Sequence, residues 1–142
     1  MTNIQALVRG DQASLPEYDM AAQRRLRTMH NVPSAEVVIV EGHLVLALDE
    51  LLPLQGLRIY VAAPDEVRLA RRLKRDVAER GRTSTSVLEQ WWSSVLPMHY
   101  EYVESSRTSA HLVVDGTAAV HTIVAAVEGE IADSRRRRRP AW

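Results

Sequence analysis

The sequence predicts an α/β domain in which helices surround a mostly parallel sheet. Short runs of β-branched residues alternate with longer amphipathic segments, which is the pattern of strand-helix-strand units. Of the 142 residues, 46% are hydrophobic, and that is enough for one buried core. There is no cysteine, so disulfide bridges and thiolate metal sites are excluded and the reducing cytoplasm is the expected compartment.

The first third of the chain is expected to contain one helix and one buried strand. Residues 1–16 show little periodicity and carry turn signals, so an irregular lead-in is predicted. The strong helix formers of residues 19–29 predict a short helix that ends before Pro33. The run AEVVIVEG, residues 35–42, is short and almost uniformly apolar, as is typical of a central strand covered on both faces.

The remaining strands are expected on either side of a long helical region. Residues 43–56 predict a helix broken near Pro53, and residues 57–63 predict a second buried strand. A third strand is expected over 110–116, followed by an amphipathic helix over 118–132.

Two long helices are expected between the second and third strands. Pro64 suits the first position of a helix that runs to Glu79, and Gly81 stands where a C-terminal cap belongs. The second helix begins near Ser84, and Pro97 should kink or break it.

The first of these helices leads into the segment RRLKRDVAERGR, which has six basic and two acidic residues. At about 100° per residue, the two faces of this helix separate by chemistry. One face carries Arg68, Arg71, Arg72 and Arg75; the other carries Leu69, Ala70, Leu73 and Val77. This pattern has two interpretations. It fits a solvated face stabilised by pairs such as Arg72 with Asp76, and it fits a clamp for phosphates, which guanidinium groups bind bidentately.

Three segments give a resemblance to a known family: LPEYDMAAQRR, AEVVIVEG, and the stretch from VRLARRLKRDVAERGR to SAHLVV. In order and spacing they resemble the uridine/cytidine kinases of the phosphoribulokinase and uridine kinase family, over residues 10–116. The resemblance implies a P-loop NTPase-like three-layer sandwich that is N-terminally incomplete, with a lid at about residues 68–90. It also implies transfer of the γ-phosphate of ATP (or GTP), with Mg²⁺, to the 5′-hydroxyl of a nucleoside.

The resemblance assigns roles to individual residues. The implied nucleoside contacts are Tyr18, Gln23, Arg72 and Gln90; the implied lid contacts to ATP are Arg75, Arg80 and Arg82; Glu41 is the implied Mg²⁺ ligand, directly or through water. Gln23 stands where the family commonly has a histidine, and Met20 replaces an aromatic residue, so the resemblance leaves pyrimidine specificity open.

The sequence has no G-x-x-x-x-G-K-[ST] motif, whose backbone N–H groups and lysine hold phosphates in kinases of this class. Its single lysine, Lys74, lies inside the arginine-rich helix. The family's catalytic aspartate also belongs to the N-terminal region without a counterpart here. Our expectation is therefore a truncated or inactive copy without catalytic residues, with truncation favoured over degeneration.

Two further functions stay open: a non-catalytic nucleoside-binding or regulatory protein that pairs with itself or with an intact kinase subunit, and an arginine-tailed nucleic-acid binder. We expect residues 1–133 to form the domain and 134–142 a disordered basic tail, which contains Arg135–Arg139. Without those five arginines the chain has 13 basic and 18 acidic residues, which argues against nucleic acid as a partner. No apolar run is long enough to span a membrane.

Overall fold

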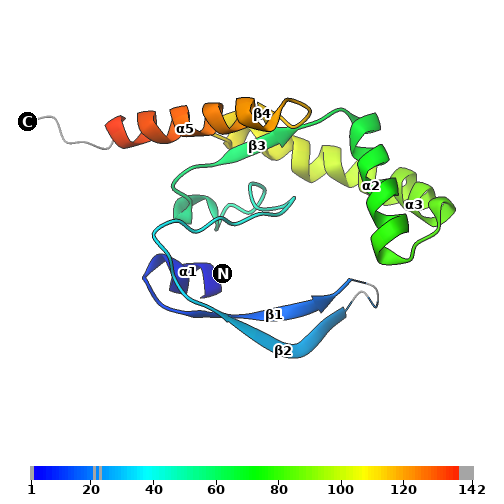
Figure 1. Cartoon of the computed structure of the whole chain (residues 1–142), viewed down its shortest axis with the longest axis horizontal. Helices are drawn as coiled ribbons and strands as arrows, with labels where there is room; N and C mark the ends of the chain where they lie inside the picture. The colour runs from blue at the N-terminus through cyan, green and yellow to red at the C-terminus, as the bar shows by residue number, and fades with distance from the viewer. Residues whose placement is uncertain (1, 21, 23, 138–142) are drawn as a thin grey trace, which may run out of the picture.

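The structure, a computed structural model, describes residues 2–20, 22 and 24–137. Within them lie two separate two-stranded sheets, joined by an irregular linker and accompanied by helices (Figure 1). One sheet is an antiparallel hairpin near the N-terminus, and the other is a parallel pair in the C-terminal half. The α/β class is confirmed, while the described residues form a much smaller sheet than a three-layer sandwich has.

The N-terminal part consists of helix α1 (Thr2–Val8) packed on the hairpin of β1 (Ala13–Asp19) and β2 (Arg24–Val32). Across the hairpin, the Glu17 carboxylate accepts a hydrogen bond from Thr28 and pairs with Nε2 of His30 at 2.6 Å. The predicted lead-in over 1–16 and the predicted helix over 19–29 are therefore both wrong. Helix propensity was overridden because cross-strand pairs and the cover of α1 stabilise the hairpin instead.

The linker, residues 33–56, has no strand and only one short 3₁₀ helix, η1 (Leu52–Leu54). The strand predicted over 35–42 is wrong: residues 35–44 are all exposed, and Ile39 is 86% exposed. The helix predicted over 43–56 is reduced to turns and η1. A central strand needs hydrogen-bonded neighbours on both edges, and none of the described strands pairs with this segment.

The parallel sheet pairs β3 (Ile59–Ala62) with β4 (Leu112–Asp115), so the strands predicted over 57–63 and 110–116 are confirmed. Directly after β4, the N–H of Gly116 donates to the carbonyl oxygen of Ala62 at 2.7 Å. A Cβ on Gly116 would lie 2.8 Å from a methyl group of Val61, so only glycine allows the backbone to approach β3 this closely.

Helix α2 (Asp65–Arg80) confirms the predicted helix, with Pro64 as its N-cap and Gly81 closing it in the left-handed conformation at φ 63°. The face that it buries is not the predicted one. Asp76 is the buried residue of α2, at 1% exposure, whereas Val77 is 43% exposed. Helix α2 packs against α3, and the side chains of Arg72 and Arg82 reach Gln90 at the end of α3.

A continuous helical run follows from Ser84 to Ser109. It consists of α3 (Ser84–Gln90), π-helical η2 (Trp91–Val95), α4 (Leu96–Met98), π-helical η3 (His99–Glu104) and 3₁₀-helical η4 (Ser105–Ser109). Thr83 caps its start by accepting a hydrogen bond from the N–H of Ser86. The predicted break at Pro97 takes the form of π-helical turns on either side, which accommodate the missing N–H donor.

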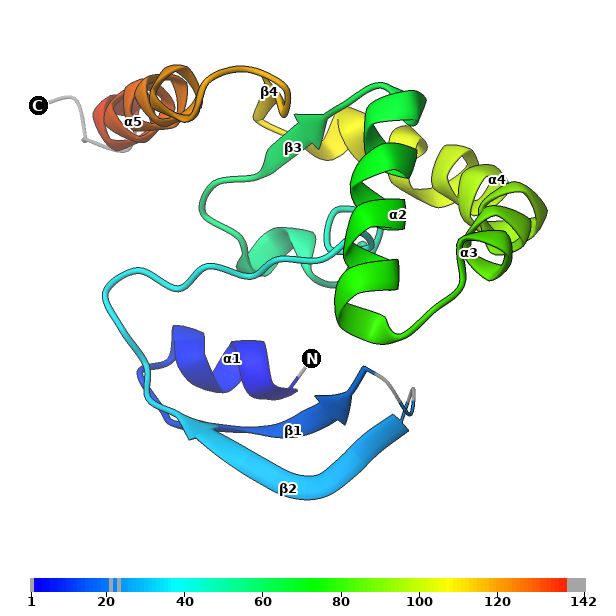
Figure 2. The same ribbon diagram turned by 45° about the vertical axis from the view of Figure 1, so that its right-hand side comes forward.

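Helix α5 (Val120–Arg137) follows β4 and extends along one edge of the molecule (Figures 1 and 2). None of its side chains from Val120 to Arg136 is buried. The helix passes beyond residue 133, so residues 134–137 of the expected disordered tail are helical, and residues 138–142 lie outside the described part. Nowhere in the described ranges does a helix have both the length and the apolar character needed to cross a bilayer.

Candidate functional site

Four arginines gather where α2 meets α3. We call Arg72, Arg75, Arg80 and Arg82, together with Asp76 and Gln90, the arginine cluster. Arg72, Arg75 and Arg80 belong to α2, whereas Arg82 follows the cap at Gly81. The guanidinium groups of Arg72, Arg75 and Arg80 lie around one carboxylate, and Arg82 adds a fourth positive charge beside Gln90, which leaves an excess of positive charge in the cluster.

Asp76 lies at the centre of the cluster. Its Oδ1 accepts a hydrogen bond from Nε of Arg75 at 2.9 Å and lies 3.2 Å from Nη1 of Arg80. Nε of Arg72 lies 3.5 Å from the other carboxylate oxygen, an ion pair in which this buried nitrogen has no hydrogen-bond acceptor. A buried carboxylate is tolerated only when it is paired, and here three guanidinium groups provide the pairing.

Gln90 joins two parts of the cluster through one oxygen. Its Oε1 accepts a hydrogen bond from Nη2 of Arg72 at 2.8 Å and a second one from Nη1 of Arg82. The other terminal nitrogen of Arg82 donates to the carbonyl oxygen of Ser86 at 3.1 Å. Arg72 and Gln90 are predicted nucleoside contacts and Arg82 is a predicted lid residue, so the structure brings the two predicted groups into direct contact.

The electrostatics of the cluster favour an added anion. Burial lowers the pKa of the Arg72 guanidinium, Asp76 acts in the opposite direction, and the positive charges of Arg82, Arg75 and Arg80 lower it further. Because the neighbouring guanidinium groups repel one another, negative charge placed beside them would be stabilised, and phosphate oxygens match the guanidinium fork.

Two further arginines of α2 bind protein groups rather than water alone. Arg68 pairs with Asp65, and its guanidinium carbon lies 5.4 Å from the centre of the Trp91 ring. Both terminal nitrogens of Arg71 donate to the carbonyl oxygen of Gly116 at 3.1 Å. The predicted pair of Arg72 with Asp76 is present, but the arginine face as a whole is tied to neighbouring elements and is not simply a solvated face.

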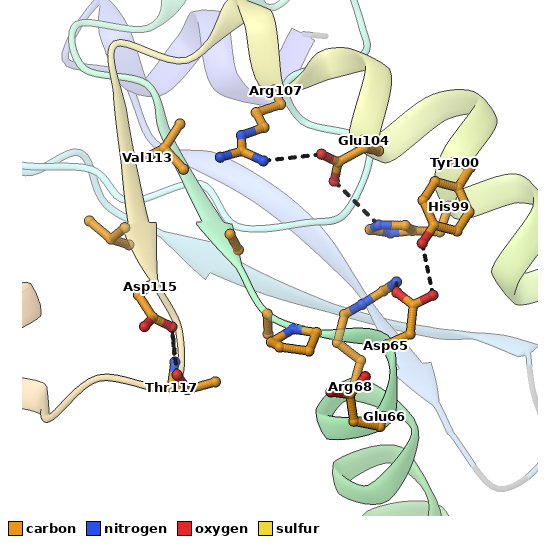
Figure 3. Close-up of a pocket in the computed structure, with 14 residues that line it drawn as sticks. Asp65, Glu66, Arg68, His99, Tyr100, Glu104, Arg107, Val113, Asp115 and Thr117 are labelled. Carbon is orange, nitrogen blue, oxygen red and sulfur yellow. Dashed lines mark hydrogen bonds and ion pairs between the residues drawn. The ribbon is translucent and has the colours of Figure 1, made fainter.

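A cavity of about 760 Å³ opens beside this helix, at the carboxyl ends of β3 and β4 (Figure 3). Ligand sites in parallel α/β sheets form at this edge. Apolar groups such as Ala62, Pro64 and Val114 line one part. The charged side chains that line it are Asp65, Glu66, Arg68, His99, Glu104, Arg107 and Asp115. The sequence analysis did not predict this cavity. A usable signal was the position of two acidic residues, Asp65 shortly after the strand predicted over 57–63 and Asp115 near the end of the strand predicted over 110–116.

Hydrogen bonds connect the charged groups that line the cavity (Figure 3). The hydroxyl of Tyr100 donates to Asp65 at 2.8 Å, and the hydroxyl of Tyr60 donates to Glu104 at 2.7 Å. Glu104 also accepts from Arg107 at 3.2 Å and lies 3.7 Å from Nε2 of His99. The walls are therefore braced by a network that leaves acids and bases side by side.

The same contacts shift the ionisation of these groups. Burial, followed by Glu104, raises the pKa of Tyr60 to about 12, and the hydrogen bond from Tyr60 is the main cause of a lowered pKa at Glu104. Burial opposes ionisation of Asp65, but hydrogen bonds from Arg68 and Tyr100 outweigh it and lower its pKa. Burial and the nearby charge of Arg68 lower the pKa of His99.

The remaining predicted site residues lie on other elements. Tyr18 is half exposed on β1, and Glu41 is exposed in the linker; Gln23 lies outside the described residues. No hydrogen bond or ion pair within the described part joins Tyr18 or Glu41 to the arginine cluster. The carboxyl end of β1, which contains Tyr18, nevertheless lies on the same side of the molecule as the carboxyl end of α2 (Figures 1 and 2).

A metal site is not assembled by this chain's carboxylates and imidazoles alone. Over residues 2–20, 22 and 24–137, no group of three or more histidine, aspartate or glutamate side chains could hold a metal ion.

Known proteins resemble most of this chain in sequence. A uridine kinase of Listeria monocytogenes is 36% identical over 124 residues, which cover 87% of this chain and 59% of that protein. A uridine kinase of Streptococcus pyogenes is 33% identical over 135 residues, covering 90% of this chain and 65% of that protein. The chain thus spans about 59–65% of the length of these curated relatives.

The family profile described as "Phosphoribulokinase / Uridine kinase family" matches residues 1–123, and the proteins of this family have a P-loop NTPase fold. The match contains the hairpin, the linker, the parallel strands and the whole arginine cluster. With a profile match over most of its length and relatives at 33–36% identity, the chain belongs to the phosphoribulokinase and uridine kinase family.

Proposed function

We propose that this chain provides the lid and part of the nucleoside site of a uridine/cytidine-type kinase, an enzyme that transfers the γ-phosphate of ATP to the 5′-hydroxyl of a nucleoside. The observation that carries the proposal is the single oxygen of Gln90 shared by Arg72 and Arg82. It joins a residue proposed for the nucleoside to a residue proposed for the phosphates, and phosphoryl transfer needs the acceptor and the phosphates close together.

In this proposal the arginines stabilise the charge of the phosphates. ATP supplies the phosphoryl group, whose negative charge is spread over its oxygens during transfer. Arg75, Arg80 and Arg82 supply guanidinium donors near those oxygens, and Arg72 with Gln90 fixes the nucleoside beside them. Tyr18 contributes an aromatic face for the base, from the end of β1 that lies toward α2 (Figure 2). Because charge stabilisation is the main work of such a site, the arginines would contribute to turnover as well as to binding.

The proposed role of Mg²⁺ depends on the nucleotide. Magnesium in kinases is commonly held by one or two carboxylates together with phosphate oxygens and water. Glu41 can provide one such carboxylate, and the described residues around it provide no further cluster of ligands. We therefore expect Glu41 to meet the ion only when the phosphates of ATP are bound.

The proposal separates binding from transfer. The sequence contains no Gly-Lys phosphate loop, so we propose that the 142-residue chain binds nucleotide without transferring phosphate on its own. Transfer would need a phosphate loop and a general base. We propose that both come from a polypeptide that completes the three-layer sandwich around β3 and β4, and that the two chains meet in the cytoplasm. An intact kinase subunit is the proposed partner for that arrangement; a second copy of this chain could pair with it but would bring no phosphate loop.

The test measures ATP binding and phosphate transfer with the same purified chain. Arg82→Gln should weaken ATP binding, measured by calorimetry, by about tenfold, which corresponds to about 1.4 kcal/mol. Arg9→Gln is the matched control, because Arg9 is an exposed arginine paired with Asp11 in the turn between α1 and β1, and it should leave the affinity unchanged. Neither protein should convert uridine to its monophosphate.

Three results would contradict the proposal. Equal ATP affinities of wild type and Arg82→Gln would return the helix to the interpretation of a solvated face. Formation of uridine monophosphate by the wild-type chain would show that transfer does not need the missing loop. Tight binding of a short RNA without binding of ATP would favour the nucleic-acid-binding alternative.

A further inference from the structure

We infer that Asp76 is the positioning residue of the arginine cluster: it fixes the guanidinium groups so that their outer edges are presented to a polyphosphate. The inference rests on the proposed function, since it concerns how the same lid binds phosphate. It assigns a role to the one buried residue of α2, which that function leaves without one.

The burial of Asp76 requires an explanation. A carboxylate at 1% exposure gives up its hydration, and burying a charge in this way is rarely a net gain in stability. A buried carboxylate surrounded by arginines is more readily explained by the orientation of those arginines than by stability.

The hydrogen bond from Arg75 shows how the orientation is achieved. Asp76 accepts from Nε, the guanidinium nitrogen nearest the side-chain stem. Within the described part the two terminal nitrogens of Arg75 have no hydrogen-bond partner. Arg75 is 45% exposed, so its terminal fork is held in place and remains accessible to an anion.

Asp76 holds the backbone of the lid turn as well. Its carbonyl oxygen accepts the N–H of Gly81 at the helix cap and the N–H of Arg82 at 3.1 Å. The carboxylate fixes Arg75 and pairs with Arg72 and Arg80, while the carbonyl fixes the start of Arg82. One residue therefore restrains all four arginines of the cluster.

A competing role for Asp76 predicts the opposite change in anion affinity when its charge is removed. If Asp76 were an internal counter-ion that competes with phosphate, its neutralisation would strengthen the binding of anions. The burial of its carboxylate and its bond to Nε argue for orientation, because a ligand that approaches the exposed terminal nitrogens does not need to displace Asp76.

The experiment titrates the full chain with inorganic tripolyphosphate, by calorimetry at two salt concentrations. Asp76→Asn keeps the size of the side chain and makes the cluster more positive by one charge. We expect about tenfold weaker binding nevertheless, a smaller salt dependence because fewer guanidinium groups engage, and partial recovery with Asp76→Glu. Unchanged or tighter binding by Asp76→Asn overturns the inference.

A second variant protects the test against misfolding of Asp76→Asn. Arg75→Lys retains the charge at an exposed position but has no Nε–H to bond Asp76 and no fork. It should weaken binding alone, and the double variant with Asp76→Asn should lose less than the sum of the two single losses. An affinity unchanged by Arg75→Lys, or strictly additive losses, overturns the inference.

A spectroscopic signature separates positioning from general stability. The Nε–H resonance of Arg75 in a ¹⁵N–¹H spectrum should be sharp and protected from exchange in the wild type, lost in Asp76→Asn and regained in Asp76→Glu. An unprotected resonance in the wild type overturns the inference. Absence of tripolyphosphate binding by the wild type overturns the proposed function as well, whereas wild-type binding that Asp76→Asn leaves intact overturns the role of Asp76 alone.

Discussion

Helix α2 and the linker that precedes β3 differ in the kind of side chain that each buries and exposes. In α2 a carboxylate is buried, because three guanidinium groups lie around it. In the linker Val37 and Ile39 are 69% and 86% exposed, because none of the described elements covers them. Full burial of such a side chain stabilises a protein by about 1.5–3 kcal/mol, and Val37 and Ile39, unlike Leu51 of the same linker, gain little of this. The difference teaches that partners, more than polarity, decide what this chain buries.

The largest expected effect comes from removing the partner that α2 buries. Asp76→Leu should lower the free energy of unfolding by about 2 kcal/mol, less than the usual 3–5 kcal/mol for breaking a buried ion pair, because the three arginines can still reach water. Chemical denaturation measures this change. Asp133→Leu is the control, since Asp133 forms an exposed pair with Arg136 at 3.7 Å, and we expect no measurable change there. Equal effects at both positions would remove the distinction between buried and exposed carboxylates.

A second prediction examines how the arginine cluster depends on the helix end. Gly81 has φ 63° and open space where a Cβ would lie, so Gly81→Ala costs about 1 kcal/mol from backbone strain alone. Gly129→Ala, inside α5 and equally unobstructed, should instead increase helix content, because alanine is the better helix former. Thermal melting and circular dichroism distinguish the two. A stabilising Gly81→Ala would show that the left-handed cap does not persist in solution.

The same comparison explains which parts of the fold the sequence predicts. Helix α2 carries its own signals: Pro64 before it, an amphipathic period, and Gly81 after it. The segments of β3 and β4 are short apolar runs that find each other as parallel partners. These elements were predicted correctly because local chemistry is enough to specify them.

The N-terminal part was predicted wrongly because its structure depends on strand pairing, which composition does not specify. Residues 19–29 favour a helix by propensity, yet β2 pairs with β1 over a register that includes Ala13 with Val32. The run of residues 35–42 has the composition of a central strand but no neighbouring strand among the described residues. Composition indicates what a segment can form, whereas pairing decides whether it forms.

Some residues of the candidate site were predicted from the sequence and others were missed. The arginines and Gln90 were assigned by resemblance, and the structure brings them together. The central role of Asp76 was missed, because a helix-face count placed its pairing with Arg72 on a solvated surface. The burial of Asp76 cannot be read from the sequence of the helix alone.

A smaller effect is expected from His99, which lines the cavity beside Glu104, Asp65, Arg68 and Tyr100. Its pKa in the folded protein lies below the ordinary 6.5, so the unfolded chain binds the proton more readily and stability falls as the pH drops below about 6.5. His99→Gln should reduce the loss of melting temperature between pH 7.5 and 5.5. The lowered pKa values of Asp65 and Glu104 add their losses only below the ordinary 3.8 and 4.5. An identical pH profile for the variant would count against this assignment.

The smallest expected effect on stability is at the linker, where a charge replaces an exposed apolar side chain. Ile39→Lys should change the free energy of unfolding by less than about 0.5 kcal/mol, because the side chain loses no packing. The run Val37–Val40 is β-branched and uncharged, however, and exposed segments of this kind associate with one another. Light scattering should therefore show several-fold less aggregate for Ile39→Lys than for the wild type, which we expect to be marginal and prone to association.

Ile59→Lys provides the control, because Ile59 is partly buried in β3 and a charge there should destabilise the parallel sheet and increase aggregation. If Ile39→Lys abolishes cooperative melting, the linker packs against the body in solution and is not free. A monodisperse wild-type monomer with a sharp thermal transition would contradict the prediction more strongly. It would show that the exposed run needs no partner, and that β3 and β4 with their helices form a self-sufficient unit, as a binding protein would require.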